Sequence, residues 1–273
     1  MSQAYSMQGA TVILFASGKG GVGKSTVSAA LAMALARGGQ RCLLIDGDIG
    51  LRSLDLMLGV QDKVLFEMAD CLQRRCTLDD AILIHPENPH LHLLVGGQEA
   101  KPKEFAEKDL RRMLRTLKQR YDYLLIDGPA GLGRGLKNFA THADRLVLVA
   151  TADEVCLRDT EKTARVLRQW TGLRPELLLN RYDERLLKQG LVGVPQGIAD
   201  ALDLALLGVI PRSEAVYAAM LQGKTLLDAE DTQPQQALYR AAARLSGRQM
   251  MTPLPQRGFF QRLVTMIRGG DAT

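Results

Sequence analysis

Short runs of consecutive apolar residues recur along the chain, and most are followed by a stretch of helical periodicity. Such runs are typical of strands that are buried on both faces of a parallel sheet. We predict strands at 11–16, 41–45, 123–127, 146–150, 176–179 and 206–210. Apolar residues at helical spacing predict helices at 27–36, 157–170, 214–222 and 235–245. Strands alternating with helices predict an α/β fold, with a mostly parallel, doubly wound sheet in three layers.

The middle of the chain is less regular. We predict helical structure over 65–84 with a turn at 77–80, a strand at 90–95 and a long helix over 103–120. One face of the long helix is apolar and consists of Leu110, Met113, Leu114 and Leu117. The other face is basic and consists of Lys108, Arg111, Arg112, Arg115 and Lys118. We interpret the basic face as a solvated surface, with an anionic docking surface as the alternative.

A glycine-rich segment between the first strand and the first helix carries the strongest chemical signal. Gly18 to Ser25 match the pattern G-x-x-x-x-G-K-[ST], whose backbone N–H groups close around a polyphosphate at a helix N-terminus. In this pattern Lys24 contacts the β- and γ-phosphates and the Ser25 hydroxyl is a ligand of Mg²⁺. The predicted nucleotide-binding residues are Gly18, Lys19, Gly20, Gly21, Val22, Gly23, Lys24, Ser25 and Thr26. The alternative is a glycine-rich turn in another doubly wound sheet.

Two other predicted strands end in acidic residues. The strand at 41–45 leads into Asp46 and Asp48, and the strand at 123–127 ends in Asp127. The carboxyl ends of parallel strands meet at one edge of the sheet, where ligands bind in open α/β folds. A strand-terminal aspartate that follows a P-loop in the chain is typical of a Walker B element. We therefore predict Asp127 as the second residue of the Mg²⁺ site, acting through a water molecule.

Lys19 indicates which class of P-loop protein the chain resembles. The pattern K-G-G-x-G-K-[ST] resembles the deviant Walker A motif of the MinD/ParA ATPases, and the likeness extends over nearly the whole chain. The resemblance implies a P-loop NTPase fold and Mg²⁺-dependent ATP hydrolysis. It also implies that Lys19 reaches the nucleotide of a partner subunit, so that an ATP-bound homodimer encloses two ATP molecules.

Further segments resemble the MinD branch of this family. Residues 46–55 resemble its switch I, with Ser53 in place of the usual Asn, and Gly128 replaces a Ser after Asp127. The resemblance assigns Asp48 to positioning the attacking water, so the predicted catalytic residues are Lys19, Lys24 and Asp48. It also assigns Asn180 and Arg181 to the adenine site and places Pro211 over the base.

Composition and cysteine spacing limit the remaining classes of function. The chain has 273 residues, 46% hydrophobic and 24% charged, with a formal net charge of +5. We expect one ATPase domain over 1–247, no secretory signal and a cytoplasmic location, because no run reaches the roughly 20 apolar residues of a membrane span. Four cysteines without metal-ligand spacing, including Cys71 and Cys76, are expected to be free thiols.

The C-terminal segment has a different character. A proline-containing linker at 248–257 precedes 258–270, which has an apolar stripe on one side and arginines opposite. This pattern resembles the membrane-targeting helix of the MinD branch and predicts contact with anionic lipid. The predicted membrane residues are Phe259, Phe260, Arg262, Leu263, Val264, Met266, Ile267 and Arg268. The alternative is a helix packed on the domain.

The resemblance implies a membrane-switch ATPase that places the division septum from the inner face of the cell membrane. Its expected protein partners are a division inhibitor and an activator of the ATPase. A flagellar-number regulator of the same family is one alternative, because residues 2–4 faintly resemble the start of that relative. A ParA-like DNA-segregation ATPase is the other, since the helix over 103–120 is basic. The apolar stripe of the tail makes nucleic acid an unlikely partner.

Overall fold

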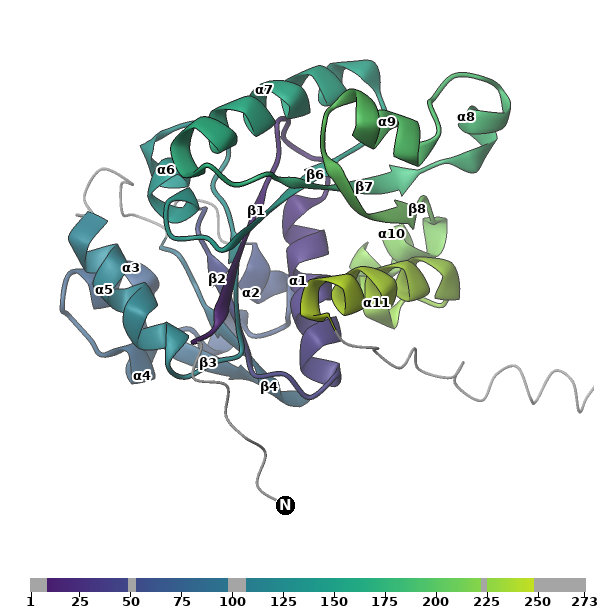
Figure 1. The fold of residues 1–273 in the computed structure, drawn as a ribbon. Helices are drawn as coiled ribbons and strands as arrows, with labels where there is room; N and C mark the ends of the chain where they lie inside the picture. The colour runs from purple at the N-terminus through teal and green to yellow at the C-terminus, as the bar shows by residue number, and fades with distance from the viewer. Residues whose placement is uncertain (1–8, 49–52, 98–106, 222–224, 248–273) are drawn as a thin grey trace, which may run out of the picture.

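A single mixed sheet forms the centre of the molecule, which the computed structural model describes at residues 9–48, 53–97, 107–221 and 225–247 (Figure 1). In these residues the sheet has eight strands in the order β3-β4-β2-β5-β1-β6-β7-β8. All neighbouring strands are parallel except β3 and β4. The strands are β1 (Thr11–Ala16), β2 (Cys42–Asp46), β3 (Ile82–His85), β4 (Asn88–Leu94), β5 (Tyr123–Asp127), β6 (Arg145–Ala150), β7 (Glu176–Tyr182) and β8 (Ala205–Pro211).

Helices cover both faces of this sheet, as the alternating pattern predicts. Helices α1 and α11 pack together on one face, while α5, α6 and α7 cover the other (Figure 1). The larger helices are α1 (Lys24–Arg37), α5 (Glu107–Lys118), α6 (Arg134–Ala140), α7 (Glu154–Thr171), α9 (Pro195–Ala201), α10 (Glu214–Leu221) and α11 (Thr232–Ser246). The shorter ones are α2 (Leu54–Met57), α3 (Met68–Leu72), α4 (Leu78–Ala81), α8 (Glu184–Lys188) and the 3₁₀ turns η1 (Gln61–Lys63) and η3 (Leu226–Asp228). The predicted α/β, doubly wound fold is confirmed.

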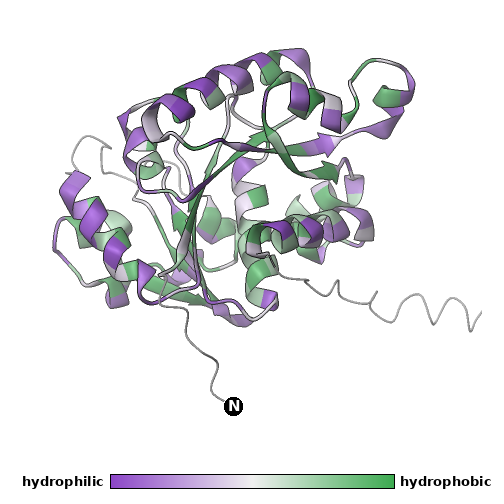
Figure 2. Cartoon of the chain, in the orientation of Figure 1, coloured by the Kyte–Doolittle hydropathy of each residue, from purple (hydrophilic) through white to green (hydrophobic). Residues whose placement is uncertain are grey.

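The hydrophobic core lies on both sides of the five central strands. Residues of β1, β2 and β5 are almost entirely buried, and so is most of α1, whose alanines allow close packing against the sheet. In Figure 2 hydrophilic residues colour much of α5 and α7 purple, whereas α1 is white to green and several strands are green. The predicted apolar face of α5 is buried and its basic residues, except half-buried Lys118, are exposed.

The prediction of helical structure over 65–84 is wrong at 82–84, and the turn predicted at 77–80 is misplaced. Helices α3 and α4 are short, and the chain then continues as β3, which pairs antiparallel with β4. The turn between the two helices comes earlier, at 73–76, and Thr77 caps the start of α4, accepting a hydrogen bond from the backbone N–H of Asp80 at 3.3 Å. Apolar residues at 82–84 fit both a helix and an edge strand, and pairing with β4 decides for the strand.

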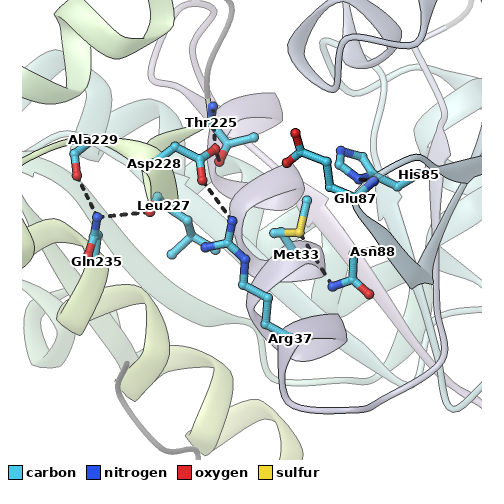
Figure 3. Close-up of polar contacts among 10 residues, drawn as sticks. All are labelled: Met33, Arg37, His85, Glu87, Asn88, Thr225, Leu227, Asp228, Ala229 and Gln235. Atoms are coloured by element: carbon cyan, nitrogen blue, oxygen red, sulfur yellow. Dashed lines mark hydrogen bonds and ion pairs between the residues drawn. The ribbon is translucent and has the colours of Figure 1, made fainter. Parts of the chain in front are cut away.

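Polar contacts hold η3 against the C-terminal end of α1 (Figure 3). The Arg37 guanidinium donates to the carboxylate of Asp228 at 2.8 Å. The side-chain amide of Gln235, from α11, donates to the backbone carbonyls of Leu227 and Ala229 at 2.9 and 2.6 Å. These bonds position Leu226, which lines the cavity described below.

The predicted linker at 248–257 and amphipathic helix at 258–270 lie outside the described residues. The predicted membrane contacts from Phe259 to Arg268 therefore stay predictions. In the described ranges no helix combines the length and hydrophobicity required to cross a bilayer.

Candidate nucleotide site

The predicted site residues converge at the carboxyl edge of the sheet. Asp46 ends β2 and Asp127 ends β5, and the two residues are neighbours in the strand register. The P-loop follows the end of β1. Asp46 and Asp127 lie on one side of it, and Asn180 and Pro211 lie on the other side, near the ends of β7 and β8. One edge of one parallel sheet thus gathers residues that are far apart in the sequence.

Two P-loop glycines have little room for a side chain. Gly23 has a φ of 90°, and a Cβ atom there would lie 2.4 Å from the amide nitrogen of Asn180. A Cβ atom at Gly18 would lie 2.5 Å from the carbonyl oxygen of Asp159 in α7. Glycine is required at Gly23 by conformation and by space, and at Gly18 by space alone.

Lys24 and Asp127 form a buried ion pair beneath the P-loop. Their Nζ and Oδ1 atoms are 2.8 Å apart, and the two side chains are only 10% and 1% exposed. The second carboxylate oxygens of Asp127 and Asp46 are buried without a hydrogen-bond partner. Burial, followed by the charge of Asp127, raises the pKa of Asp46 to about 7. The charge of Lys24 opposes this rise, so one ammonium group pairs with Asp127 and also acts on Asp46.

This charge imbalance fits a bound cation. A buried carboxylate oxygen without a partner is costly, and a hard, oxygen-seeking cation such as Mg²⁺ removes that cost. Ser25 follows Lys24 in the first turn of α1, so the two predicted metal residues, Ser25 and Asp127, belong to the same corner of the site. The residues present fit Mg²⁺ held by Ser25 and Asp127 together with phosphate oxygens.

Asp48 connects the two loops that follow β2 and β5. Its backbone N–H donates to the Asp46 carboxylate at 3.1 Å, and its own carboxylate accepts a hydrogen bond from the backbone of Ala130. Burial raises the pKa of Asp48, an effect that the charge of Lys24 opposes. A sequence motif for either loop alone does not reveal this contact. The rest of the predicted switch I, from 49 to 52, lies outside the described residues.

Lys19 has a looser environment than Lys24. Its ammonium group lies 3.6 Å from the carboxylate of Asp153, at the start of α7, and both side chains are about half exposed, at 47% and 50%. An exposed pair of this kind contributes little stability, so the side chain can exchange this partner for another at small cost. Its predicted contact with a partner subunit's nucleotide stays a prediction.

Asn180 and Arg181 hold the P-loop from the side of β7. Asn180 is only 5% exposed, and its side-chain amide donates a hydrogen bond to the carbonyl of Val22 at 2.8 Å. Arg181 has a φ of 54° and donates to the carbonyl of Gly21 at 3.1 Å. The resemblance assigned both residues to adenine. The structure adds a role that sequence reasoning missed, which is to brace the phosphate-binding loop.

A cavity of about 470 Å³ opens beside Asn180. It is lined by Thr26, Asn180, Arg181, Ile210, Pro211, Arg212, Ser213, Glu214, Val216, Tyr217, Met220 and Leu226. Its position next to the P-loop, its size and its mixture of aromatic, apolar and polar groups suit a nucleobase and ribose. Sequence reasoning found Pro211 but missed Tyr217 and Glu214. The available signal was their position just after a strand that ends at the ligand-binding edge.

The chain is similar to known ATPases of the same architecture. The family described as "AAA domain" matches residues 10–171. The chain is 35% identical to the putative septum site-determining protein MinD of Guillardia theta, over 88% of this chain and 90% of that protein. Two solved structures are similar over most of their length. One is the MinC:MinD cell division protein complex of Aquifex aeolicus, with a TM-score of 0.78, 30% identity and coverage of 90% and 98%. The other is MinD complexed with Mg-ADP from Pyrococcus horikoshii, with a TM-score of 0.75, 31% identity and coverage of 86% and 96%.

These similarities agree with the geometry of the site. The family match spans β1, the P-loop, the acidic ends of β2 and β5, and α7, which together form the phosphate-binding corner. The similarity at 30% identity or more continues through β7 and β8, where the cavity lies. The chain therefore belongs to the MinD/ParA family of P-loop ATPases, and within it is MinD-like.

Proposed function

We propose that this chain is an ATP-switched membrane ATPase that takes part in placing the division septum. The observation that carries the proposal is the buried Lys24–Asp127 pair, with unpartnered oxygens on Asp46 and Asp127, directly beneath the P-loop. The Mg-ADP complex of the Pyrococcus horikoshii relative supports a magnesium nucleotide as the ligand.

Different side chains of the site have different roles in ATP hydrolysis. Lys24 offers its ammonium group to the β- and γ-phosphates, and the P-loop N–H groups bind the phosphate oxygens. Ser25 and Asp127 would hold Mg²⁺, which would supply positive charge next to the transferred phosphoryl group. Asp48 lies between these groups and orients the attacking water through its carboxylate. Its contact with Ala130 links that carboxylate to the loop after Asp127.

Dimerisation follows from the exposure of Lys19. Its side chain stands at the surface of the P-loop, and the partner that it has among the described residues, Asp153, is itself half exposed. We propose that Lys19 instead contacts the nucleotide bound by a second copy of the chain, so that ATP joins two subunits face to face. A lysine that contributes to the neighbour's site makes each site incomplete in the monomer.

Attachment to the membrane is assigned to segment 258–270. Six apolar side chains, each worth ~1 kcal/mol when half buried in lipid, supply about 6 kcal/mol, which the cost of ordering the segment largely offsets. Two such segments on one dimer bind more tightly through effective concentration, on the order of 10²-fold. ATP-driven dimerisation thereby drives attachment to anionic lipid on the inner face of the cell membrane, and hydrolysis reverses it.

The protein partners of this cycle are assigned from the relatives. Curated relatives named as septum site-determining proteins match most of the chain, and the Aquifex aeolicus structure contains MinC together with MinD. We propose that the membrane-bound dimer recruits an inhibitor of division, and that a second protein activates its ATPase.

Vesicle sedimentation tests the proposal. Full-length protein and a chain that ends at Pro255 are each mixed with anionic vesicles, in ADP and in a non-hydrolysable ATP analogue. We expect only the full-length protein with the analogue to pellet, and a Lys19→Ala variant to stay in the supernatant while still binding nucleotide. Equal pelleting in ADP and in the analogue would contradict the switch. If no sample pellets but the protein binds DNA with a steep salt dependence, the DNA-segregation alternative replaces the proposal.

A further inference from the structure

Two of the four cysteines lie side by side on the surface, away from the nucleotide site. Cys71 belongs to α3 and Cys76 lies in the turn before α4, and their sulfur atoms are 3.4 Å apart. Both residues are partly exposed, whereas Cys42 and Cys156 are buried within β2 and α7. The ATPase cycle gives this pair of thiols no task.

The backbone holds the two thiols together. Arg74 has a φ of 61° and turns the chain back, so that its N–H donates to the carbonyl of Cys71 at 3.1 Å. Capping boxes fix the helices at both ends of this turn, through Asp70 at the start of α3 and Asp80 at the start of α4. A disulfide has a sulfur–sulfur distance of about 2.05 Å, so the two sulfurs need to approach by roughly 1.3 Å.

A small cavity gives reagents access to the pair. It has a volume of about 140 Å³ and lies between the α3–α4 turn and α5. Its lining includes Cys71 from α3, Cys76 from the turn, and Asp109, Arg112 and Met113 from α5. A cavity of this size admits a molecule as small as hydrogen peroxide, since a single water needs only ~15 Å³.

We propose that Cys71 and Cys76 form an oxidisable dithiol, a modification site whose reagent is a hydroperoxide and whose product is an intramolecular disulfide. Hydrogen peroxide supplies the oxidising equivalents. The Cys76 thiolate attacks one peroxide oxygen and the O–O bond breaks, so that Cys76 becomes a sulfenic acid and the departing hydroxide takes up a proton to give water. Cys71 then attacks the Cys76 sulfur, an S–S bond forms and a second water leaves. One peroxide and two thiols thus give one disulfide and two waters.

The contacts of the two sulfurs assign their order of reaction: the Cys71 thiol donates a hydrogen bond to the carbonyl of Thr77 at 3.3 Å, which favours its protonated form. Burial, followed by the hydrogen bond with Cys76, raises the pKa of Cys71 to about 12. Burial also raises the pKa of Cys76, and Asp70 and Asp80 add to this rise, but the hydrogen bond with Cys71 and the charge of Arg75 oppose it. Cys76 is therefore the first to react, and Cys71 resolves the sulfenic acid. Oxidation is slow at neutral pH and faster as pH rises.

The experiment uses the intact, reduced protein and hydrogen peroxide. After peroxide treatment, free thiols are blocked by alkylation, and the protein is unfolded and digested with trypsin. Arg74 and Arg75 lie between the two cysteines, so trypsin separates Cys71 from Cys76 unless a disulfide joins them. We expect the joined peptides, two hydrogen atoms lighter than their sum, to be lost on treatment with dithiothreitol. Cys42 and Cys156 are expected to be alkylated only after unfolding, which provides the internal control.

The order of reaction is tested by single variants. In Cys71→Ser, a sulfenic-acid probe such as dimedone is expected to label Cys76, whereas Cys71 in Cys76→Ser is expected to be labelled at least tenfold more slowly. Separate, alkylated peptides in peroxide-treated wild-type protein would overturn the proposal, and this measurement requires no variant to fold. Disulfides between chains in place of the joined peptides would also overturn it.

Discussion

The nucleotide site has two sides that are built in different ways. On the phosphate side, Lys24, Asp46 and Asp127 come from the core of the sheet and from the first turn of α1, and all three are buried. On the base side, Pro211 and the residues after it line an open cavity, and Tyr217 is 61% exposed. Asn180 belongs to both, because it lines the cavity and holds the P-loop.

The difference shows how the chain combines a charged site with a stable fold. The phosphate side concentrates three charged groups where water is excluded, which makes interactions with phosphate strong but leaves the empty site electrostatically costly. The base side is solvated and costs little when empty. Substitutions on the phosphate side should therefore alter both stability and activity, and those on the base side should alter affinity alone.

The largest effect is expected at Lys24. Lys24→Ala removes the ammonium group that pairs with buried Asp127 and whose charge also acts on Asp46, and we expect it to lower the free energy of unfolding by about 3 kcal/mol. ATP hydrolysis should become undetectable. Urea unfolding at pH 8 without nucleotide, together with a phosphate-release assay, measures both effects.

Two controls sharpen this prediction. Lys24→Met combined with Asp127→Leu removes both partners, and should recover much of the lost stability without recovering activity. Lys19→Ala removes an exposed pair and should change the free energy of unfolding by less than about 0.5 kcal/mol, while activity falls. Equal losses of stability in Lys24→Ala and Lys19→Ala would contradict the prediction, because breaking the buried pair would then cost no more than breaking the exposed one.

The two sides also differ in how far the sequence predicts them. Gly18, Lys24, Asp46 and Asp127 occupy fixed places in a local strand–loop or strand–acid pattern, and the parallel register of the sheet then brings them together. Tyr217 has no such pattern, because its position depends on how α10 packs after β8.

Contacts between distant loops were equally unpredictable. The Asn180–Val22 hydrogen bond joins residues 158 positions apart, and the bond between Asp48 and Ala130 joins two separate loops. Prediction of secondary structure from the sequence has a similar limit at residues 82–85. Their apolar pattern suits a helix or a strand, and only their pairing with β4 settles the choice.

An intermediate effect is expected at Asn180, which joins the two sides. Asn180→Ala leaves the carbonyl of Val22 without its partner in a nearly dry environment, at a cost of about 1–2 kcal/mol. We expect affinity for ATP to fall roughly tenfold, because the P-loop loses its brace. Calorimetry measures the affinity, and thermal unfolding measures the stability. Arg181→Ala is the matched control: its bond to Gly21 is exposed, so an equal loss of stability would contradict the prediction.

A smaller effect, confined to affinity, is expected at Tyr217. We expect its ring to stack on the base, so Tyr217→Ala should weaken binding of ATP and ADP by about fivefold, or ~1 kcal/mol. Stability and kcat should stay unchanged, because the side chain is exposed and far from the buried acids. Tyr217→Phe keeps the ring and should bind as the wild type does. A fall in kcat with unchanged affinity would contradict the prediction, because it would show that Tyr217 serves catalysis and not binding of the base.

The smallest effect is expected at His92, which belongs to neither side. His92 lies on β4 opposite Leu43, and its Nδ1 atom is 2.8 Å from the hydroxyl of Tyr121. Burial lowers the pKa of His92, so the unfolded chain takes up its proton at a higher pH than the folded protein does. The free energy of unfolding should therefore fall as pH drops from 7 to 5, and His92→Phe should make that fall shallower. Urea unfolding at several pH values measures the slope, and ATP affinity at pH 7.5 should be unchanged. A variant with an unaltered slope would mean that the acid sensitivity of the fold arises elsewhere, for instance at His85 or His142, whose pKa values burial also lowers.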